Sequence, residues 1–330
     1  MKNILILLMG LTSIYLIGCA KNNKDVLKKL KDNITNMTSY HIKGELGIVN
    51  NEDIYKYDVD VSYKEPDLFR VSLKNINNNH TQILLKNEEG VYVLTPALNK
   101  SFKFQSDWPY NNSQIYLLQS ILKDIESDTN YKVLEDGKSY IITSKVNYSN
   151  NDSFVKQNVY LDSDYNIKKV EVLDKDDIVL MNMNFNSINE RPNFSDDYFD
   201  LDSSINTSIN DEAIEVSKID SIIYPMYIPD KTYLLTQDKV PTSDGERIIL
   251  TFDGDNPFMF IEETSTTLKE HTTIPVNGNP EIIGDTIGAL SNNSISWSSG
   301  GIDYYLTSNS LSEKELLSVA NSVNVMPVGK

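Results

Sequence analysis

The stretch HIKGELGI at residues 41–48, followed by IYKYDVDVSY at residues 54–63, decides the fold. In both stretches, apolar or aromatic side chains alternate with polar ones. A period of two places alternate side chains on opposite faces of a β-strand. The connection between them is short and contains Asn50 and Asn51, residues that favour a reversal of the chain. The pair therefore predicts an antiparallel hairpin.

The same alternation continues along the chain and predicts a long antiparallel meander. Clusters of Asn, Asp, Gly and Pro separate the segments, as expected of turns between neighbouring strands. Residues 162–166 and 174–177 are two such turns. The further strands are predicted at residues 68–73, 82–85, 91–94, 101–104, 131–134, 139–146, 154–161, 167–173 and 178–185.

Two helices are predicted beside this sheet. Before it, apolar residues recur at three- and four-residue spacing at Val26, Leu27, Leu30, Ile34 and Met37. A second apolar stripe runs between Ser113 and Glu126 and consists of Ile115, Leu118, Leu122 and Ile125. A long sheet with helices on one face is an α+β arrangement, here an antiparallel half-barrel covered by helices.

A second, smaller α+β domain is predicted after a linker. Residues 202–210 are rich in Ser, Asn and Asp and have the weakest pattern. The linker is therefore assigned to residues 202–218, the half-barrel to residues 40–201 and the second domain to residues 219–330. The closing helix has a clear start, because Ser312 and Glu315 form a capping box and Leu311 and Leu316 a hydrophobic staple. The strands of the second domain are expected at residues 247–252, 258–262, 282–287, 294–297 and 302–307.

The N-terminus predicts export and lipid attachment. A short basic start and an apolar run at residues 4–17 form a signal peptide, residues 1–18, that is too short to be a permanent membrane span. Leu16-Ile17-Gly18-Cys19 matches the lipobox of bacterial lipoproteins, so cleavage is expected after Gly18 and diacylglycerol on Cys19. Residues 19–39 then hold the lipid and the first helix. The chain has 1 Cys, which excludes a disulfide. We expect a protein anchored to the extracytoplasmic face of the cell membrane.

Motifs for metal, cofactor or catalytic chemistry are missing from the sequence. His41, His80 and His271 are isolated, and the Asp162-x-Asp164-x-Asn166 pattern lacks the Gly and Glu of a calcium loop. No GxSxG or phosphate-binding glycine loop occurs. The net charge of −17 disfavours nucleic acid. We therefore predict no cofactor and no enzymatic activity, with a hydrolase assembled from distant strands as the remaining, less favoured alternative.

Aromatic and apolar residues recur along the first strands, and they permit two interpretations. One is an ordinary core, with the helices laid on that face of the sheet, and periodicity alone favours it. The other is an incompletely covered apolar groove for an acyl chain or for a partner's apolar segment. The candidate groove residues are Phe69, Leu84, Tyr92, Leu94 and Phe102.

The region up to about Leu201 resembles the lipoprotein-carrier superfamily of LolA-like and LolB-like half-barrels. The resemblance lies in residues 40–44, 64–71 and 90–96. Residues 99–110 and 114–118 are most similar to the GerS-related and YdcC-like sporulation and germination lipoproteins of Gram-positive bacteria. The part from about Ile219 resembles a small domain of unknown function found in such lipoproteins.

This resemblance implies a half-barrel of eleven or a similar number of strands, without enzymatic activity. It implies a groove for acyl chains, and Arg70 lies in the strand that matches a gating arginine of the soluble carriers. The tether at Cys19 argues against a diffusing shuttle. Relatives are tied to spore cortex modification, which implies a cell-wall amidase as one partner class and the forespore intermembrane space as one location.

Overall fold

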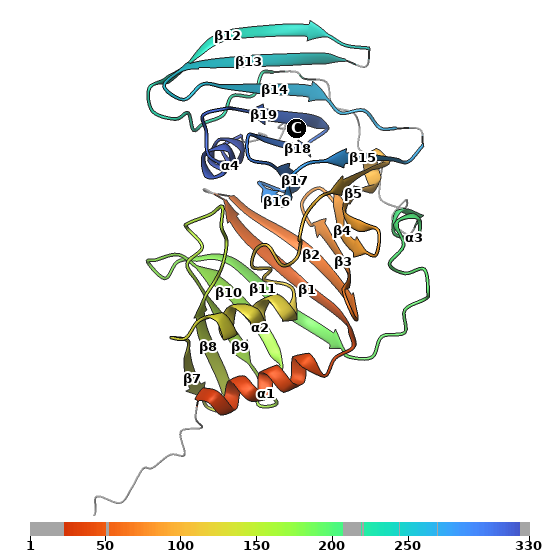
Figure 1. Cartoon of the computed structure of the whole chain (residues 1–330), viewed down its shortest axis with the longest axis vertical. Coiled ribbons are helices and arrows are strands. Elements are labelled where there is room, and N and C mark those ends of the chain that lie inside the picture. The colour runs from red at the N-terminus through yellow and green to blue at the C-terminus, as the bar shows by residue number, and fades with distance from the viewer. Residues whose placement is uncertain are drawn as a thin grey trace, which may run out of the picture.

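The computed structural model describes residues 23–50, 53–206, 219, 221–243, 245–268 and 270–323. The predicted signal peptide, Gly18 and Cys19 lie outside these residues, as does most of the predicted linker. Two sheets form two domains stacked along the long axis (Figure 1). In the described part of the chain, no helix is long and apolar enough to cross a membrane.

The first sheet has 12 strands in the order β15-β6-β5-β4-β3-β2-β1-β11-β10-β9-β8-β7. Eleven of them follow one another along the chain, as the meander predicts, and only β15 comes from later sequence. Their bounds are β1 Ser39–Asn50, β2 Asp53–Lys64, β3 Leu68–Asn75, β4 Thr81–Asn87, β5 Gly90–Thr95, β6 Lys100–Phe104, β7 Lys132–Asp136, β8 Ser139–Lys145, β9 Lys156–Leu161, β10 Ile167–Leu173, β11 Val179–Asn189 and β15 Thr272–Val276.

The central hairpin of β1 and β2 confirms the prediction from residues 41–63. Its register runs without interruption from Ser39 opposite Lys64 to Asn50 opposite Asp53. On the other side of β1, the pairing with β11 shifts at Lys43/Gly44. A side chain at Gly44 would place its Cβ 2.2 Å from the carbonyl oxygen of Asn184, so this close approach requires glycine. The bulge bends the sheet at its centre.

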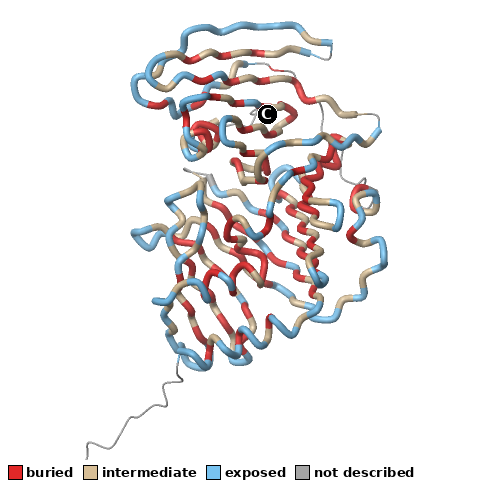
Figure 2. Tube along the Cα trace, in the orientation of Figure 1, coloured by how far each residue is buried: buried red, intermediate tan, exposed pale blue. Residues whose placement is uncertain are grey.

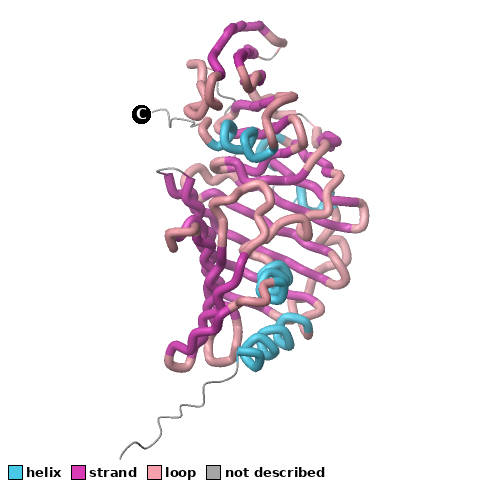
Figure 3. The backbone as a smooth tube through the Cα atoms, turned by 60° about the vertical axis from the view of Figure 1, so that its left-hand side comes forward, coloured by secondary structure: helices cyan, strands magenta, loops and turns pink. Residues whose placement is uncertain are grey.

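Two helices cover the concave face of the first sheet, α1 (Asn23–Thr35) and α2 (Leu118–Ser127). Both lie on the same side of the strands in Figure 3. The core between helices and sheet includes Val26, Leu30 and Ile34 of α1 together with Ile121 and Ile125 of α2. Buried residues alternate along the strands beneath them (Figure 2). The α+β half-barrel predicted from sequence is therefore confirmed.

The second helix begins later than the sequence pattern indicates. We expected helix from Ser113, but residues before Leu118 are irregular. Ser113 is held by the loop after β8, since its backbone N–H donates to the carbonyl of Asn147 at 2.9 Å. Its hydroxyl oxygen accepts the backbone N–H of Asn147 at 2.7 Å. These tertiary hydrogen bonds replace the first helical turn.

The convex face of the first sheet carries its own small core. Ile83, Leu85, Tyr92 and Leu94 are buried there beneath Phe199 and Ile205. Ile205 belongs to α3 (Leu201–Asn206), which occupies the start of the predicted linker. Helix α3 therefore packs on this face of the sheet, because its apolar side chain Ile205 is covered there.

The second sheet has 7 strands in the order β12-β13-β14-β19-β18-β17-β16, with α4 (Glu313–Asn321) against one face. The capping box predicted at Ser312 and Glu315 is present. One predicted strand, at residues 282–287, is instead a hairpin that turns at Gly284. The strands are β12 Thr232–Pro241, β13 Glu246–Gly254, β14 Phe258–Thr264, β16 Asn279–Ile283, β17 Thr286–Leu290, β18 Ser294–Ser299 and β19 Ile302–Thr307.

Backbone pairing between two strands and hydrogen bonds from polar side chains join the two domains. β15 leaves the second domain and pairs in parallel with β6, with Thr272 opposite Lys100 and Val276 opposite Phe104. Gln82 of β4 accepts the backbone N–H of Ile287 at 2.7 Å. Ile287 also packs in the core of the first domain. The domains therefore share one continuous hydrogen-bonded framework.

We expect Ile121→Ala to lower the free energy of unfolding by about 2–5 kcal/mol, because it opens a cavity between α2 and the sheet. Ile121 is 1% exposed. Denaturant unfolding followed by circular dichroism measures the change. Leu134→Ala is the control, since Leu134 is 62% exposed and its loss should change the free energy by less than about 0.5 kcal/mol. Equal effects of the two substitutions would contradict the described cover.

Candidate functional site at the domain junction

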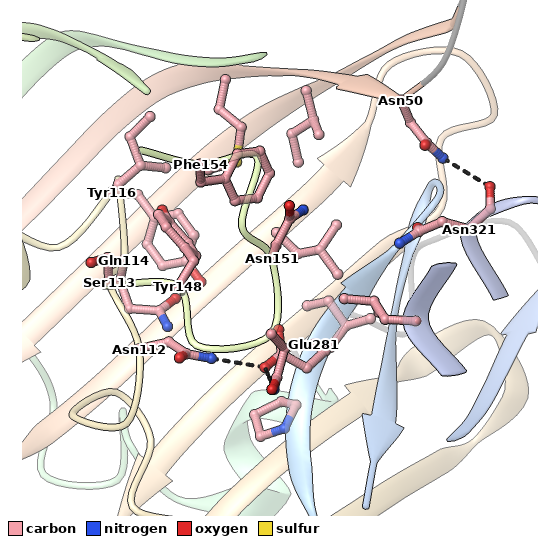
Figure 4. A pocket seen from close by; sticks show the side chains of 18 of the residues that line it. Asn50, Asn112, Ser113, Gln114, Tyr116, Tyr148, Asn151, Phe154, Glu281 and Asn321 are labelled. Carbon is pink, nitrogen blue, oxygen red and sulfur yellow. Dashed lines mark hydrogen bonds between the residues drawn. The ribbon is translucent and has the colours of Figure 1, made fainter. Parts of the chain in front are cut away.

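A pocket of about 910 Å³, counted to its open mouth, lies where the two domains meet. The first domain contributes the end of β1, the segment at residues 112–116 and the loop at residues 148–154. The second domain contributes β16 and the last turns of α4. Figure 4 shows these elements around the cavity. A concave site at a domain interface is a common place for ligand binding.

Glu281 of β16 is the acidic side chain of this pocket. Asn112 donates from Nδ2 to Glu281 Oε1 at 2.8 Å, and Asn150 donates to the same oxygen at 3.2 Å. Both amides belong to the first domain, so the carboxyl group links the two domains (Figure 4). No described residue donates a hydrogen bond to the other oxygen, Oε2. Glu281 therefore keeps an acceptor for a further group.

Burial sets the electrostatics of the pocket. It raises the pKa of Glu281 to about 7, while the hydrogen bonds from Asn150 and Asn112 partly oppose that rise. Among the described lining residues there is no Lys, Arg or His. Burial also raises the pKa of nearby Asp124 to about 6. Such perturbed carboxyl groups in a cleft are typical of functional sites.

Aromatic side chains form the opposite wall. Tyr148 and Phe154 are half-buried and meet edge to face, with ring centroids 4.8 Å apart. Tyr116 donates its hydroxyl to Gln114 Oε1 at 2.8 Å, which fixes both side chains in the lining of the pocket. The pocket thus combines an aromatic wall with amide groups and one carboxyl group.

A second cavity lies between the two sheets, about 830 Å³ counted to its open mouth. Its walls are mainly apolar, with Phe102 and Phe104 of β6 facing Ile261 and Tyr305 of the second sheet. The ion pair of Lys100 Nζ and Asp303 Oδ2, at 3.2 Å, lies among the lining residues. It is the most apolar space at the junction.

Three of the predicted groove residues lie on the concave face. Leu84 lines the junction pocket and Phe102 lines the cavity between the sheets. Phe69 is fully buried and contacts Trp108 edge to face at 6.1 Å between ring centroids. These three side chains therefore lie on one face of the sheet but in three different environments, namely the junction pocket, the cavity between the sheets and the closed core.

The other predicted groove residues lie on the convex face. Tyr92 and Leu94 belong to the small core beneath Phe199. Arg70 places its guanidinium 5.5 Å from the ring centroid of Tyr198 on that same face. Adjacent strand residues such as Phe69 and Arg70 must point to opposite sides. The expectation of one groove lined by all six residues is therefore corrected, since the sheet separates them.

Sequence reasoning missed the polar residues of the junction pocket. Long stretches of chain separate Asn112, Asn150 and Glu281, and the sequence pattern around each predicts only a loop or a strand. Ser149 donates to Asn112 and so holds Asn112 beside the loop of Asn150 within the first domain, and the docking of the second domain adds Glu281. No local motif signals that arrangement.

Metal ligands can also be brought together by the fold, without a sequence motif. The described ranges contain no group of three His, Cys, Asp or Glu side chains able to hold a metal ion. His41 instead lies 2.8 Å from Asp60 Oδ1 on the neighbouring strand. The pattern at residues 162–166 is a turn, in which Asp162 Oδ1 accepts the backbone N–H groups of Asp164 and Asn166.

The fold and the junction define a two-domain protein built on an open, mostly antiparallel α+β half-barrel. No protein-family model matches the chain. The sporulation protein YdcC of Bacillus subtilis (strain 168) is 35% identical over 327 residues, which are 98% of this chain and 97% of that protein. The chain belongs to the family of YdcC.

Solved structures show looser likenesses. A LolA superfamily protein from Nitrosomonas europaea is 10% identical, with a TM-score of 0.31 over 54% of this chain and 97% of its own. A chain in the structure of the CwlD amidase from Clostridioides difficile in complex with the GerS lipoprotein is 20% identical, with a TM-score of 0.20 over 53% and 95%. The family assignment rests on the sequence relative.

Glu281→Gln should change how stability depends on pH. Since burial raises the pKa of Glu281 from 4.5 to about 7 in the folded protein, the folded state holds the proton more tightly than the unfolded chain. Its stabilisation is complete below pH 4.5 and is lost as the pH rises through about 7. The difference in unfolding free energy between wild type and Glu281→Gln should therefore fall by up to about 3 kcal/mol over that range.

Urea unfolding at a series of pH values measures this difference. Asp124 and Glu262, whose pKa values burial also raises, are present in both proteins, so their contributions cancel. Parallel stability curves for the two proteins would contradict the buried position of Glu281.

Proposed function

We propose that this protein is a sporulation lipoprotein that acts by binding and has no catalytic activity. Lipid on Cys19 would hold it on the extracytoplasmic face of a membrane, such as that of the forespore intermembrane space. The supporting observation is the 35% identity to the sporulation protein YdcC over 98% of the chain. A relationship over both domains supports a shared role for the whole two-domain unit.

Packing on the concave face supports a binding role different from that of a soluble acyl-chain carrier. α1 and α2 fill this face with buried side chains, among them Leu30 and Ile121. A groove over the centre of the sheet is therefore occupied by the protein itself. The junction and the surface of the second domain remain for other molecules.

A protein partner in the spore envelope is the leading candidate, and a cell-wall amidase is the class that the family resemblance implies. The second domain exposes an apolar segment before β12, in which Met226 is 79% exposed, Tyr227 44% and Ile228 39%. Exposed apolar groups that gather in one segment are typical of protein contact sites. We assign this segment, residues 224–228, to partner contact.

The cavity between the sheets favours a second candidate, the binding of a lipid or lipoprotein acyl chain. Phe102, Phe104, Ile261 and Tyr305 give it apolar walls that suit an acyl chain. The candidate applies to this cavity rather than to the covered centre of the half-barrel.

Cys19→Ala should release the protein from the membrane, because the thiol that accepts diacylglycerol is lost. Membrane and soluble fractions of producing cells, probed by immunoblotting, measure the distribution. Met37→Ala is a control that should stay with the membrane. A Cys19→Ala protein that remained fully in the membrane fraction would overturn the lipid anchor.

Met226→Asp should strongly reduce co-purification of an envelope partner from sporulating cells, because a charge in an apolar contact is costly. Amidase activity in the purified material and mass spectrometry measure the partner. Leu134→Asp is the matched control, since Leu134 is 62% exposed on β7, the strand at the opposite edge of the first sheet from β15.

A fluorescent fatty acid separates the two candidates. Saturable binding that Phe102→Asp abolishes, with no amidase retained, would favour the acyl chain over the protein partner. Retention of an amidase by the wild type and the control, but not by Met226→Asp, supports the partner. Turnover of ester or peptidoglycan substrates by the protein alone would contradict a binding role.

A further inference from the structure

The junction pocket around Glu281 has the chemistry of a site for an uncharged polar ligand. Its one carboxyl group, Glu281, is accompanied by no cationic side chain among the described lining residues. A phosphate, a carboxylate or a nucleotide would find repulsion and no counter-charge there. The ligand class is therefore neutral, or positively charged.

The unused hydrogen-bonding groups narrow this class. Glu281 Oε2 can accept a hydrogen bond, and three side-chain amides can donate one. The oxygens of Gln114, Asn151 and Asn321 are already occupied by Tyr116, Ser153 and Gly284. No described residue accepts from the NH₂ groups of these three amides. A matching ligand offers a hydroxyl or N–H to the carboxyl group and carbonyl or hydroxyl oxygens to the amides.

The aromatic and apolar walls indicate a ligand with one apolar face. Tyr148 and Phe154 line one side, and Ile48, Leu84 and Met181 extend this wall. A pyranose ring has an apolar face of C–H groups and an edge of hydroxyl groups. An acetamido substituent adds a carbonyl acceptor and a methyl group.

We propose that the junction pocket binds a neutral saccharide that carries acetamido groups, through Glu281, Gln114, Asn151 and Asn321 and the ring of Tyr148. The ligand would bridge both domains, since Glu281 and Asn321 belong to the second domain and the other residues to the first. The site shares no lining residue with the segment at residues 224–228, although Met226 and Tyr227 donate hydrogen bonds to Ser322, next to Asn321. Variants at Glu281 and Gln114 therefore test the saccharide site without changing the proposed partner contact.

Isothermal titration calorimetry tests the proposal with the chain from Ala20 onward, which contains every described residue. The probes are N,N′-diacetylchitobiose, cellobiose and glucosamine. We expect saturable binding of the acetylated disaccharide and weaker binding of cellobiose, which lacks the acetamido groups. At pH 8, above the raised pKa of about 7, most Glu281 carboxyl groups are ionised. At that pH, Glu281→Gln should weaken the binding of the acetylated disaccharide at least about tenfold, because Oε2 is lost as a charged acceptor.

Glu135→Gln is the matched control, because it removes an exposed carboxylate on β7 and should leave binding unchanged. Gln114→Ala is a second variant that removes one amide donor without touching Glu281, and circular dichroism confirms that each variant is folded. Absence of binding, unchanged binding to folded Glu281→Gln, or tighter binding of glucosamine than of the acetylated sugar would overturn the proposal. The last result would identify an ammonium site instead.

Discussion

The parallel pairing of β15 with β6 is the constraint on which the arrangement of the two domains depends. It takes a strand from the second domain and makes it the edge of the first sheet, next to Lys100–Phe104. Antiparallel neighbours can be joined by a short turn, whereas a parallel neighbour must arrive from a distance. The second sheet is thereby held over the open end of the half-barrel. Both cavities at the junction exist because of this placement.

Polar contacts across the junction strengthen the same arrangement. Gln82 contacts Thr286 and Ile287, and Lys100 pairs with Asp303. Each links side chains about 200 positions apart in the sequence, so none forms until both domains are folded. Glu281 belongs to this set, but it differs because one of its oxygens faces the pocket. A group that helps to join the domains can therefore also sense a ligand between them.

Much of the first domain could be predicted from sequence because its strands obey a two-residue period and its turns contain Asn, Asp and Gly. The helix before the sheet was equally clear, with Val26, Leu30 and Ile34 all buried as their spacing predicts. The faces were harder to assign. Phe69, Tyr92 and Leu94 are alike in chemistry, but the pairing register decides which side each one takes, and register depends on partners along other strands.

The remaining features depend on long-range contacts that no local pattern encodes. β15 has the sequence TTIPV, in which a proline interrupts a strand pattern of five residues. β12 contains the polar run TQDK, so neither segment predicts a strand. The junction pocket is assembled mainly from five separate segments, three of the first domain and two of the second. Helix α2 begins later than the sequence pattern predicts because Ser113 forms hydrogen bonds with Asn147 instead of belonging to a helical turn.

The position of α1 determines how far the junction between the domains lies from the membrane surface. Its first residue, Asn23, follows Cys19 by four positions, a stretch that spans at most about 14 Å. With lipid on that cysteine, the lysines of α1 lie near the bilayer surface, where anionic headgroups attract them. Figure 1 places the second domain at the opposite end of the molecule from α1. In that arrangement the half-barrel separates the junction from the lipid and holds it toward the polymer layer outside the membrane.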